Sequence, residues 1–553
     1  MLKLALACAF AVFSLFSSWA KASPLEYRFT APYQGAGTIT LYNNTDQNII
    51  VTQLEFDVNA EIGGTYGALS SYTSTLTKEK NAESTSYHYT LNEGKNSITI
   101  GAHNKADMTY TFNNQLGPLP IGMNASNIKL NNQLLDIQGI CQGAACNDPT
   151  PGKRIIGYYS DWDQYGIGYL PAQIPVDKAN TIHYSFVNYD TRGQVILYDP
   201  YADSAQIPAI ATMRQQHPYL NVSLSFGGWT LSSNFSALAR DPVATDNFVK
   251  NAVAAMKEAH FNGIDIDWEY PVTGSFNKNS GKIDPGQSDD AANYATLLTK
   301  LRTKLDEQGS IDNKKYFLTI AAPAGVDKIQ SIQNADPTAW KKITNAVDYV
   351  DVMAYDFHGA WDKYSDFMSA MALDPEKDPS AKDPVMKQYA ILAALDLYQK
   401  IGVPVQKIVL GIPAYGRMSN IAQLGGDNLG LYQEITGTPL GEYDQNGEVS
   451  GMFDYKCIVD TTQCKLNGAS LLSGLVQVDS SNPLAKDAHT PWGYIPGKNQ
   501  FITFDDATST AYKANWIVQQ HFAGAMFWEF SGDLDGNNPK SLVNVVYQVF
   551  KRS

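Results

Sequence analysis

From residue 153 to the C-terminus the sequence repeats one order of elements: strand, loop, helix. Short runs rich in Val, Ile, Leu and aromatic residues recur eight times, and segments with apolar residues at helical spacing, such as 289–307 and 384–401, separate them. The eight expected strands are Arg154–Ser160, Thr181–Asn188, Asn221–Phe226, Gly263–Glu269, Tyr316–Ala322, Tyr349–Tyr355, Lys407–Ile412 and Ala523–Trp528. This alternation predicts an α/β fold, the (β/α)8 TIM barrel.

A doubly wound open sheet is the alternative to the barrel. Several of the expected strands end on polar or aromatic residues, which a barrel explains because its active sites gather at the C-terminal ends of the strands. An open sheet gives no such reason. The segment from about 418 to 500 is too long for a plain loop, and its turn-rich β patterns, such as Gly451–Lys456, predict an insertion after the seventh strand.

The fourth expected strand carries three carboxylates at alternate positions: Asp265, Asp267 and Glu269. Alternate side chains share one face of a strand, so neighbours in this row lie roughly 6.5 Å apart. Burying three unpaired charges costs several kcal/mol each, so the row must share protons or hydrogen bonds. Like charges raise each other's pKa values. We therefore expect Glu269, the last member, to be a protonated acid near neutral pH at the barrel mouth.

Two other interpretations of the acidic row are a solvated edge strand and a site for Mg²⁺ or Ca²⁺. An edge strand would be approached by polar residues, whereas the run before it, Ala252–Met256, is apolar. Carboxylate sites for these cations draw their ligands from flexible loops more often than from one stiff strand. The pattern therefore favours catalysis without a metal.

The segment around this row resembles the signature of the family-18 glycoside hydrolases, the chitinases and their relatives, written Asp-x-x-Asp-x-Asp-x-Glu. Asp265, Asp267 and Glu269 match it, and Asn262 stands where the family has its first Asp. One strand earlier, the run from Ser225 to Gly228 resembles the family's Ser-x-Gly-Gly. The long segment after the seventh strand also resembles the α+β insertion of many bacterial chitinases.

The resemblance implies a secreted chitinase that hydrolyses β-1,4 bonds between N-acetylglucosamine units with retention of configuration. In the implied mechanism the acetamide oxygen of the substrate attacks the anomeric carbon, Glu269 protonates the leaving oxygen and then acts as base, and Asp267 orients the acetamide nitrogen. Asp265 would hold the spare proton. Three carboxylates on one face cannot easily attack the far side of the sugar, although the sequence alone leaves open Asp356 as a protein nucleophile.

Other strand ends resemble segments that bind the sugar in this family. Met353–Asp356 resembles Met-x-Tyr-Asp, and the family's Tyr-Gly-Arg matches Tyr415–Arg417. The resemblance implies that Tyr355 and Asp356 act with the acidic row in catalysis. The expected substrate-binding residues are Trp162, Phe186, Gly228, Trp229, Met353, Trp361, Tyr415, Arg417 and Trp528.

Two further functions remain as alternatives. An endo-β-N-acetylglucosaminidase acting on N-glycans could use the same site, but aromatic strand ends along a groove favour a long, repetitive substrate. A chitin-binding protein on an inactive barrel is the other, but inactive relatives typically lose the terminal Glu, and Glu269 is retained.

Charge and composition limit the partners. The net charge of −14 makes nucleic acid and anionic membranes poor partners, whereas a neutral polymer such as chitin is indifferent to it. We expect a monomer without a cofactor or a metal.

The N-terminus predicts a secretory signal peptide over residues 1–22. Lys3 precedes the apolar run 4–16, and Ala20-Lys21-Ala22 has the small-x-small pattern of a cleavage site. The run is too short to span a bilayer, and a lipoprotein signal ending at Cys8 would leave almost no apolar region. We therefore expect an extracellular or periplasmic protein.

The four cysteines beyond the signal form two close pairs in the sequence. Export permits disulfides, so we predict Cys141–Cys146 and Cys457–Cys464. Zinc is the alternative, but no histidine stands at ligand spacing near either pair.

Residues 23–140 show short strands separated by turn residues, which predicts a β-sandwich module, and 141–152 has the composition of a linker. Such a module could bind polysaccharide or act as a spacer. Binding would need aromatic platforms, and after the signal no Trp precedes Trp162. Four tyrosines could substitute for Trp in that role: Tyr66, Tyr72, Tyr87 and Tyr89.

Overall fold

The computed structural model describes residues 25–33, 36–58, 62–66, 76–80, 87–92, 98–112, 125–137, 141 and 146–553. The expected signal peptide, Tyr72 and the side chain of Tyr66 lie outside the described part of the chain. Within that part, no helix is both long enough and apolar enough to cross a membrane.

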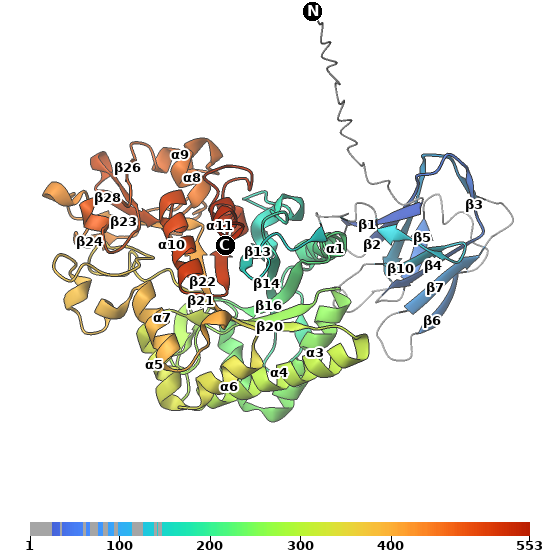
Figure 1. Cartoon of the computed structure of the whole chain (residues 1–553), viewed down its shortest axis with the longest axis horizontal. Helices are drawn as coiled ribbons and strands as arrows, with labels where there is room; N and C mark the ends of the chain where they lie inside the picture. The colour runs from blue at the N-terminus through green and yellow to red at the C-terminus, as the bar shows by residue number, and fades with distance from the viewer. Residues whose placement is uncertain are drawn as a thin grey trace, which may run out of the picture.

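Eight parallel strands close into a barrel, as the sequence predicted (Figure 1). They follow one another around the cylinder in chain order, and β13 pairs with β14 on one side and with β29 on the other. The strands are β13 (Arg154–Ser160), β14 (Thr181–Tyr189), β16 (Asn221–Gly227), β17 (Gly263–Asp267), β20 (Phe317–Pro323), β21 (Tyr349–Met353), β22 (Ile408–Pro413) and β29 (Gly524–Trp528). A short strand, β15 (Val195–Ile196), pairs antiparallel with β14 at the mouth.

Helices surround the barrel and pack their apolar faces on the strands. They are α1 (Pro200–Gln216), α2 (Phe235–Arg240), α3 (Pro242–Glu258), α4 (Asp290–Asp312), α5 (Val326–Ala335), α6 (Ala339–Ala346), α7 (Ile391–Lys400), α10 (Ala507–Gln519) and α11 (Leu542–Phe550). Several begin at side-chain caps: Asp199, Asp241 and Asp506 accept hydrogen bonds from the first free backbone N–H groups. Between β13 and β14 there are only two 3-10 turns, η3 (Asp161–Gln164) and η4 (Pro171–Gln173).

Among the element boundaries that differ from the sequence prediction, those at the ends of β17 and β21 matter for function. Strand β17 ends at Asp267, so Glu269 lies two residues beyond the sheet. Strand β21 ends at Met353, which leaves Tyr355 and Asp356 in the following loop. Helix α7 begins at Ile391 instead of near 384, because 380–388 form two 3-10 turns.

The insertion after β22 forms an antiparallel sheet with small helices. It comprises β23 (Tyr415–Ile421), β24 (Ile435–Gly437), β25 (Met452–Asp454), α8 (Tyr455–Val459), α9 (Gly468–Leu471), β26 (Val476–Val478), β27 (Trp492–Ile495) and β28 (Gln500–Phe504). The predicted disulfide Cys457–Cys464 is present in it. The insertion starts at Tyr415, earlier than expected, because the chain leaves the barrel at Pro413 and at once joins the new sheet.

The N-terminal region consists of two five-stranded sheets around a separate apolar core. One contains β1 (Leu25–Tyr33), β2 (Ala36–Asn43), β5 (Ile62–Tyr66), β9 (Lys105–Phe112) and β12 (Asp136–Ile137). The other contains β4 (Gln53–Val58), β6 (Leu76–Lys80), β7 (Tyr87–Asn92), β10 (Ser126–Leu130) and β11 (Gln133–Leu134). A short pair, β3 (Ile49–Val51) and β8 (Ile98–Ile100), adjoins them. Tyr89 is part of this core, stacked on Phe56, so it cannot serve as an exposed platform.

The segment that joins the two regions is attached to the barrel. The predicted disulfide Cys141–Cys146 is present, and the Asp148 carboxylate accepts hydrogen bonds from Arg154 at 2.7 Å and from Asn180 at 2.9 Å. Strand β1 lies against α1 (Figure 1), and β12 also contacts this helix. Residues 148–153 therefore hold one position on the barrel although their composition is typical of a linker.

Candidate active site

The Asp265 carboxylate lies inside the barrel and is surrounded by hydroxyl donors. Tyr158 and Ser225 donate to its Oδ2 at 2.9 and 2.7 Å, and Thr319 donates to Oδ1 at 2.6 Å. Ser225 on β16 and Thr319 on β20 are in register with Asp265 on the two neighbouring strands, and Tyr158 reaches it from β13 across the barrel. Both oxygens of Asp265 therefore have partners although the side chain is fully buried.

The next member of the row, Asp267, has the opposite environment. It is buried, and its Oδ1 atom has no hydrogen-bond partner. Burial raises the pKa of Asp267 well above its usual value, and the charges of Glu269, Asp265 and Asp351 raise it further. Asp267 is therefore a carboxyl that favours its protonated form and keeps one oxygen free as an acceptor.

Glu269 is half-buried at the mouth, and its backbone N–H donates to Ser232 Oγ at 3.0 Å. Burial raises the pKa of Glu269 to about 7 against the lowering effect of the Tyr270 hydroxyl, and the charge of Asp356 adds to the increase. Because a general acid works best when its pKa lies near the working pH, Glu269 is suited to donate a proton near neutrality.

The end of the third strand turns directly beneath Glu269. Gly227 and Gly228 have φ angles of +116° and +73°, in the region that favours glycine. A Cβ atom on Gly228 would lie 2.4 Å from the Phe186 ring, and one on Gly227 would lie 2.0 Å from the Asp267 carbonyl oxygen. The Gly228 N–H donates to that same carbonyl at 2.8 Å. These contacts explain why the Ser-x-Gly-Gly turn needs both glycines.

Asp356 and Arg417 form a bidentate ion pair across the mouth, with Nε–Oδ1 and Nη2–Oδ2 distances of 2.9 and 2.7 Å. The guanidinium also lies over the rings of Trp361 and Tyr415, 5.2 and 5.4 Å from their centroids. Arg417 belongs to β23 and Asp356 to the loop after β21, so this pair joins the insertion to the barrel.

Aromatic rings form the floor of the mouth. Trp528 stacks on Phe186 with ring centroids 5.7 Å apart and lies 5.2 Å from the ring of Tyr158. We call these three rings the aromatic floor. Tyr355 and Tyr415 meet edge to face beside it, and the Tyr355 hydroxyl lies 3.8 Å from Met526 Sδ. Met353 packs with the floor residues inside the barrel.

The remaining predicted tryptophans lie around the rim. Trp162 is 37% exposed and 6.4 Å from Trp528. Trp229 is 49% exposed and stacks on Phe276 at 5.5 Å, and Trp361 is 59% exposed. The structure thus brings all the predicted site residues to one end of the barrel, with Trp229 and Trp361 farthest out of the core.

Several residues of this site escaped the sequence analysis. Tyr158 and Thr319 are common hydroxyl residues, and nothing but their period-two position on strands marks them as inward-facing. Ser225 was noted only as the start of the Ser-x-Gly-Gly turn, not as a donor to Asp265. Glu529 lies behind Trp528, accepts a hydrogen bond from Ser160, and has a pKa raised to about 7 by burial, which its hydrogen bonds with Ser160 oppose.

A buried pair lies below the acidic row and was not expected. His183 on β14 and Asp351 on β21 are fully buried, with Nε2 and Oδ2 3.0 Å apart. Strand patterns identify both as inward-facing only once the barrel is assumed. Their charges act directly on the row.

Two groups in the described residues have the spacing of metal ligands: Glu442 with Cys457 and Cys464, and His183 with Asp265 and Asp351. In the first group the two sulfurs are joined in a disulfide. In the second, both oxygens of Asp265 already accept hydroxyl hydrogen bonds and both nitrogens of His183 have partners. Neither set of donor atoms therefore suits a cation.

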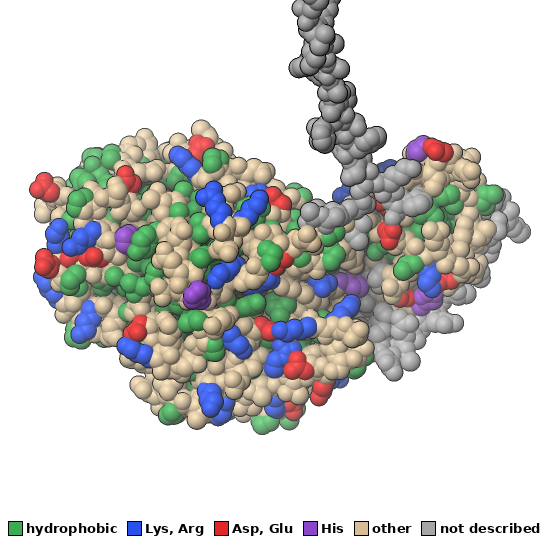
Figure 2. Space-filling model, in the orientation of Figure 1, with side chains coloured by type: hydrophobic (Ala, Val, Ile, Leu, Met, Phe, Trp, Pro, Cys, Tyr) green, Lys and Arg blue, Asp and Glu red, His purple; other side chains and the backbone are tan. Residues whose placement is uncertain are grey.

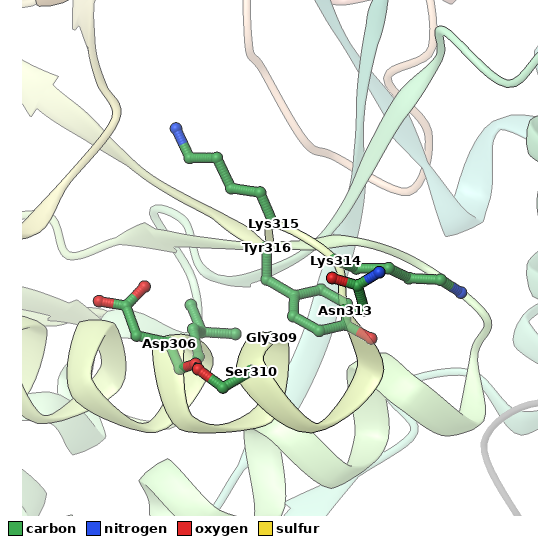
Figure 3. A pocket seen from close by; sticks show the side chains of 8 residues that line it. Asp306, Gly309, Ser310, Asn313, Lys314, Lys315 and Tyr316 are labelled. Atoms are coloured by element: carbon green, nitrogen blue, oxygen red, sulfur yellow. The ribbon is translucent and has the colours of Figure 1, made fainter.

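A surface hollow of about 480 Å³ lies at the other end of the barrel (Figure 3). It is formed by the last turns of α4 and the chain entering β20, and Asp306, Ser310, Asn313 and Tyr316 line it. Because β20 begins there, the hollow is at the N-terminal end of the strands, away from the acidic row.

A (β/α)8 barrel with an acid of raised pKa at its mouth, a buried carboxyl with one free oxygen beside it and an aromatic floor is typical of glycoside hydrolases. The sequence profile described as "Glycosyl hydrolases family 18" matches residues 154–533. The chain belongs to this family.

Known relatives agree with this assignment. The chain is 32% identical over 435 residues to "Chitinase A1" of Niallia circulans, and the match covers 70% of this chain and 58% of that protein. It is 28% identical to "Chitinase 1" of Aphanocladium album, covering 71% and 84% of the two chains. Among solved structures, the chitinase ChiA74 from Bacillus thuringiensis superimposes with a TM-score of 0.62 and 26% identity, covering 72% and 70%.

Proposed function

We propose that this protein is a secreted chitinase that hydrolyses β-1,4 bonds between N-acetylglucosamine units by a retaining, substrate-assisted mechanism. The observation that carries the proposal is the pair formed by Glu269, with its raised pKa, and Asp267, with its unpartnered oxygen. The names of the relatives support the choice of substrate.

Glu269 would supply the proton for the leaving oxygen. Its position two residues beyond β17 places it at the mouth, where a polymer can reach it, while Asp265 and Asp267 stay buried in the sheet. The acetamide oxygen of the bound sugar attacks the anomeric carbon as the glycosidic bond breaks, which gives an oxazolinium ion. Glu269, now a carboxylate, then takes a proton from the water that opens this ring, so configuration is retained.

The hydrogen bonds favour a different proton arrangement from the expected one, in which Asp265 holds the spare proton. Three hydroxyl donors stabilise Asp265 as a carboxylate, whereas Asp267 has few partners and a strongly raised pKa. We therefore place the proton of the free enzyme on Asp267. A neutral Asp267 still has Oδ1 as an acceptor for the acetamide N–H, so it can orient the attacking group.

The side chains around the row would hold the sugar. The cleaved unit would stack on Trp528 in the aromatic floor, and the hydroxyls of Tyr355 and Tyr415 would bind its acetamide. Trp162, Trp229 and Trp361 would contact neighbouring units. Because both oxygens of Asp356 are held by Nε and Nη2 of Arg417, it is a poor nucleophile, which favours the attack by the substrate's own acetamide.

The test is Glu269→Gln, which keeps the size and hydrogen bonds of the side chain but cannot transfer the proton. We expect turnover of chitohexaose to fall by about a hundredfold or more while its dissociation constant changes little. Glu307→Gln, an exposed substitution on α4, is the control. Near-normal turnover by the Glu269 variant would contradict the assignment of the acid.

Product analysis separates the alternatives. Release of short oligosaccharides from chitin, with none from a glycoprotein, would exclude an endo-β-N-acetylglucosaminidase acting on N-glycans. Binding of chitin without turnover would show that the protein is a chitin-binding protein. Export is part of the proposal, supported by the apolar N-terminal segment and by the two disulfides.

A further inference from the structure

A histidine inside the barrel is the closest basic group to the acidic row. His183 Nε2 lies 4.0 Å from Asp265 Oδ1 and 3.0 Å from Asp351 Oδ2. Its other nitrogen, Nδ1, is 2.5 Å from Ser223 Oγ. The ring of Tyr158 packs edge-on against the imidazole at 5.0 Å. Each polar atom of the ring therefore has a partner, and no water is needed to satisfy it.

Four side chains from four strands lie against His183: Tyr158 on β13, Ser223 on β16, Asp265 on β17 and Asp351 on β21. Ser225, Thr319 and Asp267 act on Asp265 and lie one step farther from the imidazole. Ser223, Ser225, Thr319 and Tyr158 are neutral, and the three aspartates are acidic. Among the described residues, no Lys or Arg forms an ion pair with any of these three carboxylates.

The charges around His183 decide whether its imidazole is protonated. Burial by itself lowers the pKa of His183, but the charges of Asp265 and Asp351 outweigh this effect, and the pKa is raised overall. An ionised Asp351 without a cation beside it would strongly destabilise the folded protein, because it is buried and its acidic neighbour Asp265 has the same sign of charge. The positive charge of a protonated His183 compensates the negative charges of Asp351 and Asp265.

We propose that His183 is a positioning residue for the reaction: as an imidazolium paired with Asp351, it keeps Asp265 ionised and leaves the shared proton of the row on Asp267. The kinetic test of this proposal rests on the proposed function, whereas the spectroscopic test of the charge of His183 does not. The pair does not touch the substrate, since it lies below the acidic row in the closed interior of the barrel. It acts through Asp265.

The direction of the effect follows from Coulomb's law. A positive charge about 4–8 Å from the row, at an effective dielectric constant of about 20, stabilises the ionised carboxyls by an amount worth about one and a half to three pH units. Removing it makes every carboxyl of the row hold its proton to a higher pH. Both limbs of the pH profile of kcat/KM should then move upward together.

The kinetic test is His183→Gln, which can donate to Asp351 and accept from Ser223 but carries no charge. We expect both limbs of the pH profile to move to higher pH by about one and a half units or more. The matched control is His358→Gln. His358 is also buried and also has two acidic neighbours, Asp362 at 3.2 Å and Asp366 at 3.6 Å, but these are in the loop after β21. The two limbs of the pH profile of His358→Gln should stay where they are in the unmodified protein.

A second measurement does not depend on the activity of the variant. In the unmodified protein labelled with ¹⁵N-histidine, the resonances of His183, assigned by their loss in His183→Gln, should show both ring nitrogens protonated at pH 7. A neutral tautomer at that pH, or limbs that do not move in the variant, would overturn the proposal. If the unmodified protein turned over no chitin oligosaccharide, the proposed function would fail, and the spectrum would still decide the charge of His183.

Discussion

At the scale of single residues, the three carboxyls of the acidic row differ in the number of hydrogen-bond donors around them. Asp265 has three hydroxyl donors, Asp267 has an oxygen without one, and Glu269 lies at the mouth with a raised pKa. Three chemically similar groups therefore hold their protons differently. Environment, more than residue type, assigns the acid.

This arrangement predicts the pH dependence of the enzyme. With the pKa of Glu269 at about 7 in the free protein, the acid is protonated below that pH and loses its proton as the pH rises through it. We expect kcat/KM on chitohexaose to fall on the alkaline side with a midpoint near pH 7. A profile that stays flat to pH 9 would contradict the assignment, and thermal scans at each pH would exclude unfolding as the cause.

At the scale of elements, the site depends on the joint between the barrel and the insertion. The Asp356–Arg417 pair links the loop after β21 to β23, and Trp361 and Tyr415 flank the guanidinium. A planar guanidinium can hold both carboxylate oxygens at once, which an ammonium group cannot. The shape of the mouth on this side therefore depends on one side chain.

Arg417→Lys tests this joint. We expect kcat/KM on chitohexaose to fall about tenfold, mainly through KM, because Asp356 and the rings around it lose their fixed positions. Arg240→Lys is the control, since Arg240 also makes two bonds to one carboxylate, that of Asp289, but on the exposed surface. Equal losses in the two variants would show that the site does not depend on the joint.

At the scale of the whole molecule, the described part of the N-terminal region packs on the barrel and contributes no side chain to the candidate site. Its strands β1 and β12 lie against α1, and it has its own core. On the face drawn in Figure 2, acidic and basic side chains are interspersed among neutral and apolar ones. Tyr89 is buried and this region has no Trp after the expected signal, which leaves fewer rings for polymer binding; spacer and binding roles both stay predictions.

Removing residues 23–145 while keeping the signal segment tests the spacer role. We expect turnover of chitohexaose and of insoluble chitin to stay unchanged, because the acidic row and the aromatic floor lie wholly in the barrel. The melting temperature should fall, since the deletion exposes the face of α1 that β1 covers. A selective loss on insoluble chitin would show instead that the module binds the polymer.

Much of this protein was determined by local sequence. Eight apolar runs with helical segments between them specify the barrel, because each pattern can bury its apolar face only in that arrangement. Period-two alternation specifies that Asp265 and Asp267 share a face. The disulfide partners stand so close in the chain that spacing alone identified them.

Only the tertiary structure decided which carboxyl holds the proton and what balances its charge. Tyr158, His183, Thr319 and Asp351 are far from Asp265 in the chain and meet it only because the strands close in register. The bidentate partner of Asp356 likewise comes from the insertion. Electrostatic effects depend on distance in space, and local patterns contain no information about which distant side chains will approach.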